Sequence, residues 1–278
     1  MAGRIAASIE ISPRQAQESA DLSGLFPAGT LVYMTDVGTD SAETIAVGAR
    51  RLKDLGYCAV PHFASRRLTT RRVLENRIAM LAAEAGVDNV LVVGGGLEAQ
   101  AGEFGASIEV LETGLFDRYG IRRIGVAGHP EGSPDFSDSV AEEALKLKQA
   151  FAERTGAEMR IVTQFGFDAK QFIRWADGLS SAGVDLPVHL GVAGPAKLTT
   201  LVKFAAMCGV GNSISFLKKR AGAISTLMAG FDPDEIVDPL ERHVSGNPDG
   251  AIRQIHVFPF GGMKKAAEWL HQRGSWSA

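Results

Sequence analysis

The most constraining feature of this chain is a regular alternation between two hydrophobic patterns. Short runs rich in β-branched and apolar residues occur at 5–11, 30–35, 58–63, 89–93, 123–127, 159–167, 188–192 and 252–258. Stretches with helical spacing lie between them, at 42–55, 70–85, 107–119, 139–154, 169–182 and 197–207, and one more follows at 263–272. Strands that alternate with helices indicate parallel βαβ units rather than a sandwich.

The number of strands specifies the α/β fold further. Eight strands with a helix after the last make one circuit of a (β/α)8 TIM barrel, and 278 residues is an ordinary length for that fold. We therefore predict a single barrel domain over residues 1–278, with an open doubly wound sheet as the alternative. Left-handed caps are expected to end the helices at Gly56, Gly86, Gly120, Gly156, Gly183 and Gly209. Residues 213–250 depart from the alternation of strand and helix. We expect two helices there, the first carrying Lys218, Lys219 and Arg220.

Charge and hydropathy bear on the partners of the protein. The formal net charge is −3, so the attraction to phosphate that drives nucleic-acid binding has no obvious source. No run approaches the roughly 20 apolar residues of a membrane span, and the first residues do not resemble a signal peptide. Cys58 and Cys208 lie in hydrophobic runs and are expected to be buried thiols of a reducing compartment. We expect a cytoplasmic protein that binds neither nucleic acid nor membranes.

Glu10 is the first candidate for chemistry. It lies near the end of the first strand, where alternation sends Ile9 and Ile11 to the opposite side. If the isoleucines pack against the helices, Glu10 faces the barrel interior close to the carboxyl ends of the strands, where barrel active sites lie. Desolvation there raises a carboxyl pKa and suits a general acid. A glutamate that is simply salt-bridged inside the barrel is the structural alternative.

Four histidines fall on strands or at their ends: His62, His129, His189 and His256. A metal hydrolase barrel uses such a set. However, the first strand lacks a His-x-His pair and carboxylate partners are sparse. We therefore interpret the histidines as hydrogen-bonding groups for a polar ligand and predict no catalytic metal.

The sixth strand ends in the run 162–168, Val-Thr-Gln-Phe-Gly-Phe-Asp. Gln164 is expected to face the barrel opening, where its amide offers a donor and an acceptor to a heteroaromatic ring. Phe165 and Phe167 face the other way, or flank a ligand if the strand bulges at Gly166. Asp168 suits the N-cap of the next helix.

Two glycine clusters follow strands. The run 94–96 after the fourth strand allows close approach of a ligand to the backbone. Gly261 and Gly262 precede a helix start, which suits a phosphate or a simple turn.

Several of these motifs, in this order, resemble those of the methylenetetrahydrofolate reductase family. They are Ser8-Ile9-Glu10-Ile11-Ser12-Pro13, Pro61-His62-Phe63, His129-Pro130-Glu131-Gly132-Ser133-Pro134-Asp135, Thr163-Gln164-Phe165-Gly166-Phe167-Asp168, Val188-His189-Leu190-Gly191-Val192 and Lys203-Phe204-Ala205-Ala206-Met207. The similarity runs from about residue 5 to 270. Its most specific parts are the glutamate on the first strand and the Thr-Gln-Phe-x-Phe-Asp run on the sixth.

The resemblance implies an enzyme that interconverts 5,10-methylenetetrahydrofolate and 5-methyltetrahydrofolate, with hydride from FAD that NADH or NADPH reduces. Glu10 takes the role of the general acid that protonates the departing N10. Gln164 takes that of the pterin contact, with Phe165 and His189 as further substrate contacts. Cofactor contacts fall at Thr35, His62, Gly95, Gly96, His129, Glu131 and Lys146. The resemblance also implies a homo-oligomer, because the family often associates.

This sequence departs from the family pattern at positions whose residues contact the flavin in the family. The family's Arg-Gly-Asp after the fourth strand is Gly94-Gly95-Gly96 here, and the expected arginine after the eighth strand is Gly262. The flavin-holding residues after the fifth strand correspond to Lys146, Gln149 and Ala150. Each lost charged contact weakens binding by about 1.5–3 kcal/mol. Either other contacts hold FAD, or hydride passes directly from the nicotinamide to the folate.

Two rival functions come from other classes. A Schiff-base lyase or aldolase needs a desolvated lysine in the barrel opening, and none of the eight strand ranges contains a lysine. A non-catalytic folate or flavin binder would keep Gln164 but would not need an acid at Glu10. Turnover therefore discriminates an enzyme from a binder.

Overall fold

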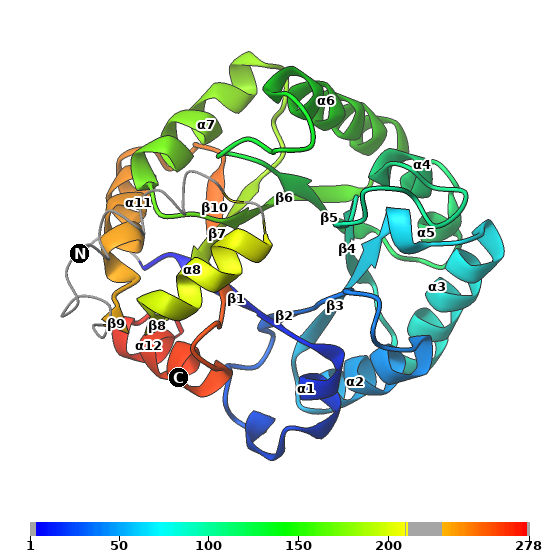
Figure 1. Ribbon diagram of the computed structural model, residues 1–278, viewed down its shortest axis with the longest axis horizontal. Helices are drawn as coiled ribbons and strands as arrows, with labels where there is room; N and C mark the ends of the chain where they lie inside the picture. Colours follow the sequence, from blue (N-terminus) through cyan, green and yellow to red (C-terminus); the bar gives the residue numbers. More distant parts are fainter. Residues whose placement is uncertain (1–3, 209, 211–229, 277–278) are drawn as a thin grey trace. The chain divides into compact units, whose positions relative to one another are not determined.

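The computed structural model describes residues 4–208, 210 and 230–276, and its eight parallel strands form a closed barrel (Figure 1). The hydrogen-bonded order is β1-β10-β7-β6-β5-β4-β3-β2. The bounds are β1 Ala6–Ile11, β2 Leu31–Met34, β3 Cys58–Ala64, β4 Asn89–Val93, β5 Arg123–Gly128, β6 Glu158–Phe165, β7 Val188–Ala193 and β10 Ile252–Phe258. The predicted (β/α)8 fold is confirmed, and the open sheet is excluded.

Helices connect the strands, as the helical spacing predicts. They are α1 Pro13–Glu18, α2 Ala42–Asp54, α3 Arg71–Ala85, α4 Ser107–Leu111, α5 Leu115–Arg118, α6 Asp138–Thr155, α7 Ala169–Ser181, α8 Leu198–Met207, α11 Asp234–Gly246 and α12 Met263–Arg273, with the 3-10 helices η1 Ala20–Leu22 and η2 Ser65–Arg67. Asp168 caps α7 as expected, since its side chain accepts hydrogen bonds from the backbone N–H groups of Lys170 and Gln171.

The structure corrects several expectations about these connections. The helix expected at 107–119 is two short helices, because Gly114 takes a left-handed conformation with φ +70° between them. Helix α1 was not predicted; Ser12 and Gln15 form its capping box, and Pro13 occupies its first turn. A two-stranded antiparallel sheet, β8 Ala196–Lys197 with β9 Gly230–Phe231, was also missed.

The remaining expectations about the connections have mixed outcomes. Left-handed glycines stand at five predicted helix ends, namely Gly56, Gly86, Gly120, Gly156 and Gly183. Of the two helices expected in 213–250, the second is α11, which begins at Asp234. The first, with Lys218, Lys219 and Arg220, and the cap at Gly209 lie outside the described residues.

The chain divides into two compact units, each made of separate segments. The N-terminal unit comprises Ile9–Ala127 and Leu147–Ile161, and the C-terminal unit comprises Met1–Ser8, Gly128–Lys146 and Val162–Ala278. Fully buried apolar side chains form the core of each, such as Val32, Leu74 and Val90 in the first and Phe165, Phe172, Leu190 and Leu270 in the second. The single domain stays a prediction.

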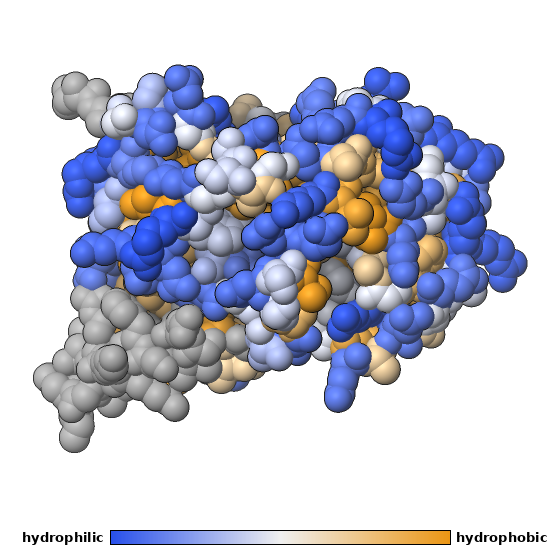
Figure 2. All heavy atoms as spheres, turned by 90° about the horizontal axis from the view of Figure 1, so that it is seen from above, coloured by the Kyte–Doolittle hydropathy of each residue, from blue (hydrophilic) through white to orange (hydrophobic). Residues whose placement is uncertain are grey.

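Hydrophilic residues prevail on the face of the molecule in Figure 2, with small separate apolar patches among them. Among the helices that the structure describes, none has the length and apolar character to cross a membrane. The prediction that both cysteines are buried is wrong: Cys58 is partly exposed and Cys208 is exposed. Both stand at element ends, at the start of β3 and at the C-cap of α8, where the packed layer stops.

Candidate active site

Glu10 and His62 face each other in the N-terminal unit. Glu10 precedes the last residue of β1, and the neighbouring Ile9 and Ile11 are 0% and 2% exposed on the opposite side of the strand. The Glu10 side chain is 16% exposed, and its Oε2 lies 3.6 Å from Nε2 of His62 on β3, whose side chain is 11% exposed. Glu10 is therefore largely buried on the side of the strand that the alternation predicts, and the neighbouring His62 was not part of that prediction.

The surroundings of Glu10 change its acidity. Burial raises the pKa of its carboxyl group above the ordinary value, and the nearby His62 partly counteracts this rise. A carboxyl group with a raised pKa keeps its proton closer to neutral pH. Such a group can donate a proton to a ligand, which is the requirement for a general acid.

A buried cation lies deeper in the same unit. The Arg160 side chain donates from Nε to Oη of Tyr33 and from Nη2 to Oδ1 of Asn89, both at 2.8 Å. Tyr33 is fully buried and its ring meets the ring of His62 edge-on, with centroids 6.0 Å apart. Burial raises the pKa of the Tyr33 hydroxyl, against the opposing effect of Arg160. Tyr33 therefore stays protonated and links this cation to His62.

Sequence reasoning missed Arg160 and Tyr33, although a signal was available. Arg160 lies four residues before Gln164 on the same strand, so alternation puts both on the same face. Placing Gln164 in the interior therefore implied an interior arginine. Tyr33 lies two residues before Thr35, so alternation likewise puts these two side chains on the same face. Thr35 itself directly follows β2, and its N–H donates to the carbonyl of Ile11.

A second ion pair fixes the end of β3. Arg77 on α3 donates from Nη2 to the carbonyl oxygen of His62 and from Nη1 to Oδ2 of Asp36 at 2.8 Å. The same Asp36 oxygen accepts the N–H of Ala64 at 3.2 Å. The side chains of Arg77 and Asp36 are 11% and 7% exposed, so solvent screens this pair weakly. The contacts hold the backbone of His62 in place.

The predicted glycine loop after β4 lies against the end of β3. Gly95 has φ +87°, a left-handed conformation that favours glycine, and a Cβ there would lie 3.0 Å from the Ala64 methyl group. A Cβ added at Gly94 or Gly96 would meet no atom within 4 Å. The backbone at Gly94 and Gly96 is thus open to a ligand, while Gly95 sets the turn.

Arg66 organises the rest of this loop. Its N–H donates to the carbonyl of Gly94, and its side chain donates to the carbonyls of Leu97 and Gly105 at 3.1 Å each. The N–H of Ala101 in turn donates to the carbonyl of Arg66. One residue of η2 therefore contacts the loop at four points.

Gln164 and Phe165 lie in the C-terminal unit, at the end of β6. Gln164 is partly exposed, and its Oε1 accepts the N–H of Phe165 at 3.2 Å. Phe165 is fully buried among other phenylalanines, with ring centroids 6.0 Å from Phe167, 5.4 Å from Phe258 and 4.8 Å from Phe260. In this conformation Phe165 packs in the core, and only Gln164 of the two offers surface to a ligand.

His189 on β7 and His256 on β10 are 8% and 0% exposed in the same unit. Nδ1 of His256 lies 3.0 Å from the Ser8 hydroxyl. Near His189, strands β6 and β7 approach closely, since a Cβ at Gly191 would lie 2.5 Å from the carbonyl oxygens of Thr163 and Gln164. Only glycine fits at position 191.

The remaining predicted cofactor residues follow β5. The His129 ring meets Phe136 edge-on, with centroids 4.9 Å apart. The Glu131 carboxylate lies against Gly166, where a Cβ would be 2.5 Å from its Oε1. Lys146 is 43% exposed and pairs with Glu142 at 2.6 Å on the outer face of α6. Across the described part of the chain, no three His, Cys, Asp or Glu side chains are grouped to hold a metal ion.

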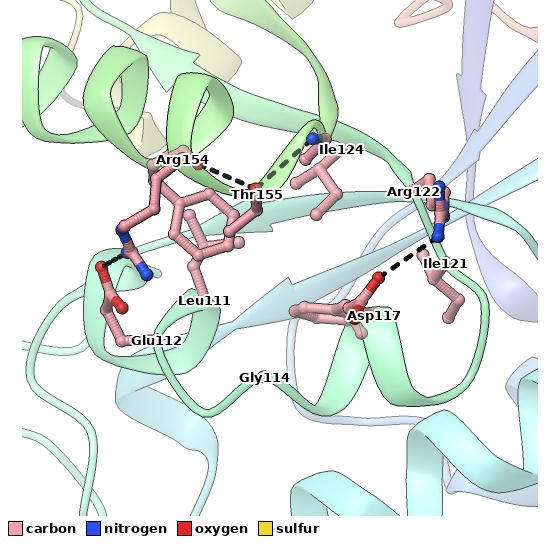
Figure 3. Close-up of a pocket in the computed structure, with 12 residues that line it drawn as sticks. Leu111, Glu112, Gly114, Asp117, Ile121, Arg122, Ile124, Arg154 and Thr155 are labelled. Atoms are coloured by element: carbon pink, nitrogen blue, oxygen red, sulfur yellow. Dashed lines mark hydrogen bonds and ion pairs between the residues drawn. The ribbon is translucent and has the colours of Figure 1, made fainter.

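One cavity lies away from these residues, in the N-terminal unit (Figure 3). It has a volume of about 200 Å³ and opens between α4, α5, the start of β5 and the end of α6. Ion pairs of Arg154 with Glu112 and of Arg122 with Asp117 flank it. Because it adjoins the amino end of β5, it is not at the carboxyl ends of the strands, where barrel active sites lie.

Comparisons with known proteins agree with these motifs. Methylenetetrahydrofolate reductase 1 of Schizosaccharomyces pombe is 33% identical over 160 residues, which are 54% of this chain and 24% of that protein. The 5,10-methylenetetrahydrofolate reductase of Pectobacterium carotovorum is 26% identical over 221 residues, 75% of this chain and 70% of that protein. The chain thus spans about a quarter of the yeast protein.

Among solved structures, an uncharacterized protein from Clostridium thermocellum has the same fold. It aligns with a TM-score of 0.56 at 11% identity, over 97% of each chain, and is described as binding two copies of 5-methyl-5,6,7,8-tetrahydrofolic acid. The sequence model of the methylenetetrahydrofolate reductase family matches residues 21–221, well over half of this chain. The protein therefore belongs to the methylenetetrahydrofolate reductase family.

Proposed function

We propose that the protein interconverts 5,10-methylenetetrahydrofolate and 5-methyltetrahydrofolate by hydride transfer. Family membership supports the substrate class and the reaction type. The observation that carries the proposal for this chain is the buried Glu10 with its raised pKa, because this reaction needs a proton donor at the folate. The folate bound by the Clostridium thermocellum protein of the same fold is consistent with it.

Toward the methyl product, the bond between the bridging methylene carbon and N10 breaks, and N10 takes the proton of Glu10. N5 keeps the methylene carbon as an iminium, and hydride addition to that carbon gives the methyl group. The carboxylate left on Glu10 lies beside His62, whose protonated form would stabilise it. Gln164 on β6 and His189 on the neighbouring β7 are proposed to bind the substrate, and Phe165 is proposed to support Gln164 from the core.

FAD is the proposed source of the hydride, with NADH or NADPH reducing it. The open backbone at Gly94 and Gly96 fits the approach of a flat ring system. Thr35, His62, Gly95 and Gly96 are proposed to hold this group. The family resemblance adds His129, Glu131 and Lys146 as proposed cofactor contacts.

A second candidate is direct hydride transfer from the nicotinamide without a flavin. Two observations favour it. Lys146 is half-exposed and already paired with Glu142, and the loop 94–96 contributes no charged side chain. Under this candidate the purified protein is colourless and active, whereas a yellow preparation that loses activity with its colour supports FAD.

Turnover tests the proposal directly. We expect the purified protein, a reduced nicotinamide and 5,10-methylenetetrahydrofolate to yield 5-methyltetrahydrofolate, measured by chromatography, with and without added FAD. Folate binding is measured in parallel. Binding without turnover in either direction would identify a non-catalytic folate binder, and absence of both would reject the assignment.

A further inference from the structure

A second cavity lies in the N-terminal unit, between α2 and α3. It has a volume of about 390 Å³, within the range of small-ligand pockets. The loop after β2, the first turn of α2, η2 and the first half of α3 form its walls. Ile45, Leu68, Val73 and Met80 supply apolar surface, and Arg67 and Arg77 supply cationic groups.

Two arginine nitrogens in this cavity have no acceptor. The Nε atoms of Arg67 and Arg77 are buried, and neither donates a hydrogen bond to any residue that the structure describes. A buried donor without an acceptor destabilises a protein, more so when the group is charged. The other donors of Arg77 are used on Asp36 and His62. The Arg77 guanidinium also lies over the Phe63 ring, 4.5 Å from its centroid, so its Nε is closed to a ligand. An oxyanion in the cavity would instead give the guanidinium group of Arg67 an acceptor.

The sequence around Arg67 makes this side chain distinct from its neighbours. Four arginines occur at 66, 67, 71 and 72. The Arg66 side chain donates to two loop carbonyls, Arg71 donates to the carbonyl of Thr113, and Arg72 is exposed outside the cavity. Arg67 alone of the four lines the cavity. Its guanidinium lies over Gly38, where a Cβ would be 2.5 Å from Nη1.

The acidic side chains of the cavity are engaged elsewhere. Asp36 pairs with Arg77, and Asp40 pairs with Arg14 at 3.2 Å. Hydrogen bonds from its own backbone N–H and from Ser41 lower the pKa of Glu43, so its carboxylate is held at the start of α2. Among the described residues, no carboxylate forms an ion pair with Arg67.

We propose that this cavity binds an oxyanion group carried by a molecule with an adjacent apolar part, through the guanidinium group of Arg67. This inference rests on the proposed function for the identity of the ligand. Two partners of that reaction carry such groups: the nicotinamide dinucleotide has phosphates, and the folate has glutamyl carboxylates. Planar guanidinium groups bind both kinds of oxyanion in a fork geometry. Arg77 also contacts the His62 backbone, so the bound group adjoins the strand that carries His62.

Binding measurements that need no turnover test the site. Inorganic pyrophosphate is titrated into the wild type and into Arg67→Gln by calorimetry. The source is identified with NADH, NADPH, and 5-methyltetrahydrofolate carrying one or four glutamates. We expect Arg67→Gln to weaken pyrophosphate and one of the two partner classes by about tenfold or more. The matched control is Arg72→Gln, which removes the same charge outside the cavity.

Further outcomes decide between the alternatives. Asn76→Asp adds a carboxylate at an exposed position of the cavity wall and should weaken the same ligand even if Arg67→Gln folds poorly. Equal losses in Arg67→Gln and Arg72→Gln would indicate diffuse charge attraction and overturn the site. Unchanged binding of all five ligands in Arg67→Gln and Asn76→Asp would overturn it too. Pyrophosphate binding that depends on Arg67, without any binding of folate or nicotinamide, would keep the site and reject the proposed function.

Discussion

Glu10 shows how one side chain can be costly for the fold and useful for the reaction. Its carboxyl group is largely withdrawn from water, and its Oε2 lies 3.6 Å from Nε2 of His62. The raised pKa keeps the group protonated at higher pH than an exposed glutamate. Ionising it in the folded protein is unfavourable, which is the property of a proton donor.

Replacing Glu10 separates binding from chemistry. Glu10→Gln keeps the shape and removes the proton, so we expect turnover to fall by about 100-fold or more while folate affinity changes little. Steady-state kinetics and calorimetric binding measure the two. Glu18→Gln, at an exposed position on α1, is the matched control. Full activity in Glu10→Gln would show that another group is the acid.

The pH dependence should identify the histidine that acts on Glu10. Methyl formation needs protonated Glu10, so the rate should fall as pH rises through the raised pKa of this group. His62 lowers that pKa, and His62→Gln should therefore move the falling limb to higher pH, whatever it does to the maximal rate. Tyr33 and Arg160 are unchanged in this variant. If the rate falls at the same pH in His62→Gln as in the wild type, His62 does not lower the pKa of Glu10.

At the scale of elements, the strand and helix bounds expected from the hydrophobic periodicity of the sequence agree closely with those of the structure. The largest difference among the strands is at β6, expected to end at 167 and observed to end at Phe165. Period cannot predict where a helix is interrupted, and Gly114 splits the segment 107–119 through its backbone conformation. The hydrophobic periodicity predicts which face of a strand a side chain occupies, but not which side chain of another strand it contacts. The inward position of Glu10 was predictable, whereas its pairing with His62 depends on the register of β1, β2 and β3.

Helix α6 carries two lysines in opposite situations. Lys146 is half-exposed and paired with Glu142, while Lys148 is 6% exposed, and burial lowers its pKa to about 8. In the unfolded chain the same amine titrates near the ordinary lysine pKa of 10.5. Stability should therefore rise between about pH 8 and 10.5, where the unfolded chain binds the extra proton. At neutral pH the fold carries a buried charge that costs about 3 kcal/mol.

Removing the buried amine should stabilise the protein. Lys148→Met keeps the length of the side chain, and we expect the free energy of unfolding near pH 7 to increase by up to about 3 kcal/mol. The rise in stability above pH 8 should disappear at the same time. Urea denaturation at several pH values measures both. Lys146→Met, the control, should change stability by less than about 0.5 kcal/mol. A destabilised Lys148→Met would indicate that the amine has a stabilising role.

At the scale of the whole molecule, neither compact unit is a continuous stretch of chain. The N-terminal unit takes Leu147–Ile161 from the second half of the sequence, and the C-terminal unit takes Met1–Ser8 from its start. Helix α6 and strand β6 each contribute residues to both units. Neither unit can therefore form before most of the chain is available.

We expect one cooperative unfolding transition, as the single-domain prediction requires. Calorimetry should give a van't Hoff enthalpy that equals the calorimetric enthalpy. Fluorescence and circular dichroism should show the same midpoint. Two resolved transitions would instead mean that the units unfold independently, and the chain would then have two domains.

Arg66 holds the loop after β4 through backbone groups, and this affects how far the amino-acid sequence of the loop can vary. Its guanidinium contacts the carbonyl oxygens of Leu97 and Gly105, and every amino acid has a carbonyl oxygen. Exposed side chains of this loop, such as those of Glu98 and Ala99, can therefore be exchanged by evolution or in a laboratory library without loss of the loop's path, provided that position 66 keeps its arginine. Gly102, where a Cβ would clash with the carbonyl group of Thr69, and the buried Phe104 are not exchangeable in this way. Cofactor preference can be re-engineered on this loop with a constant anchor.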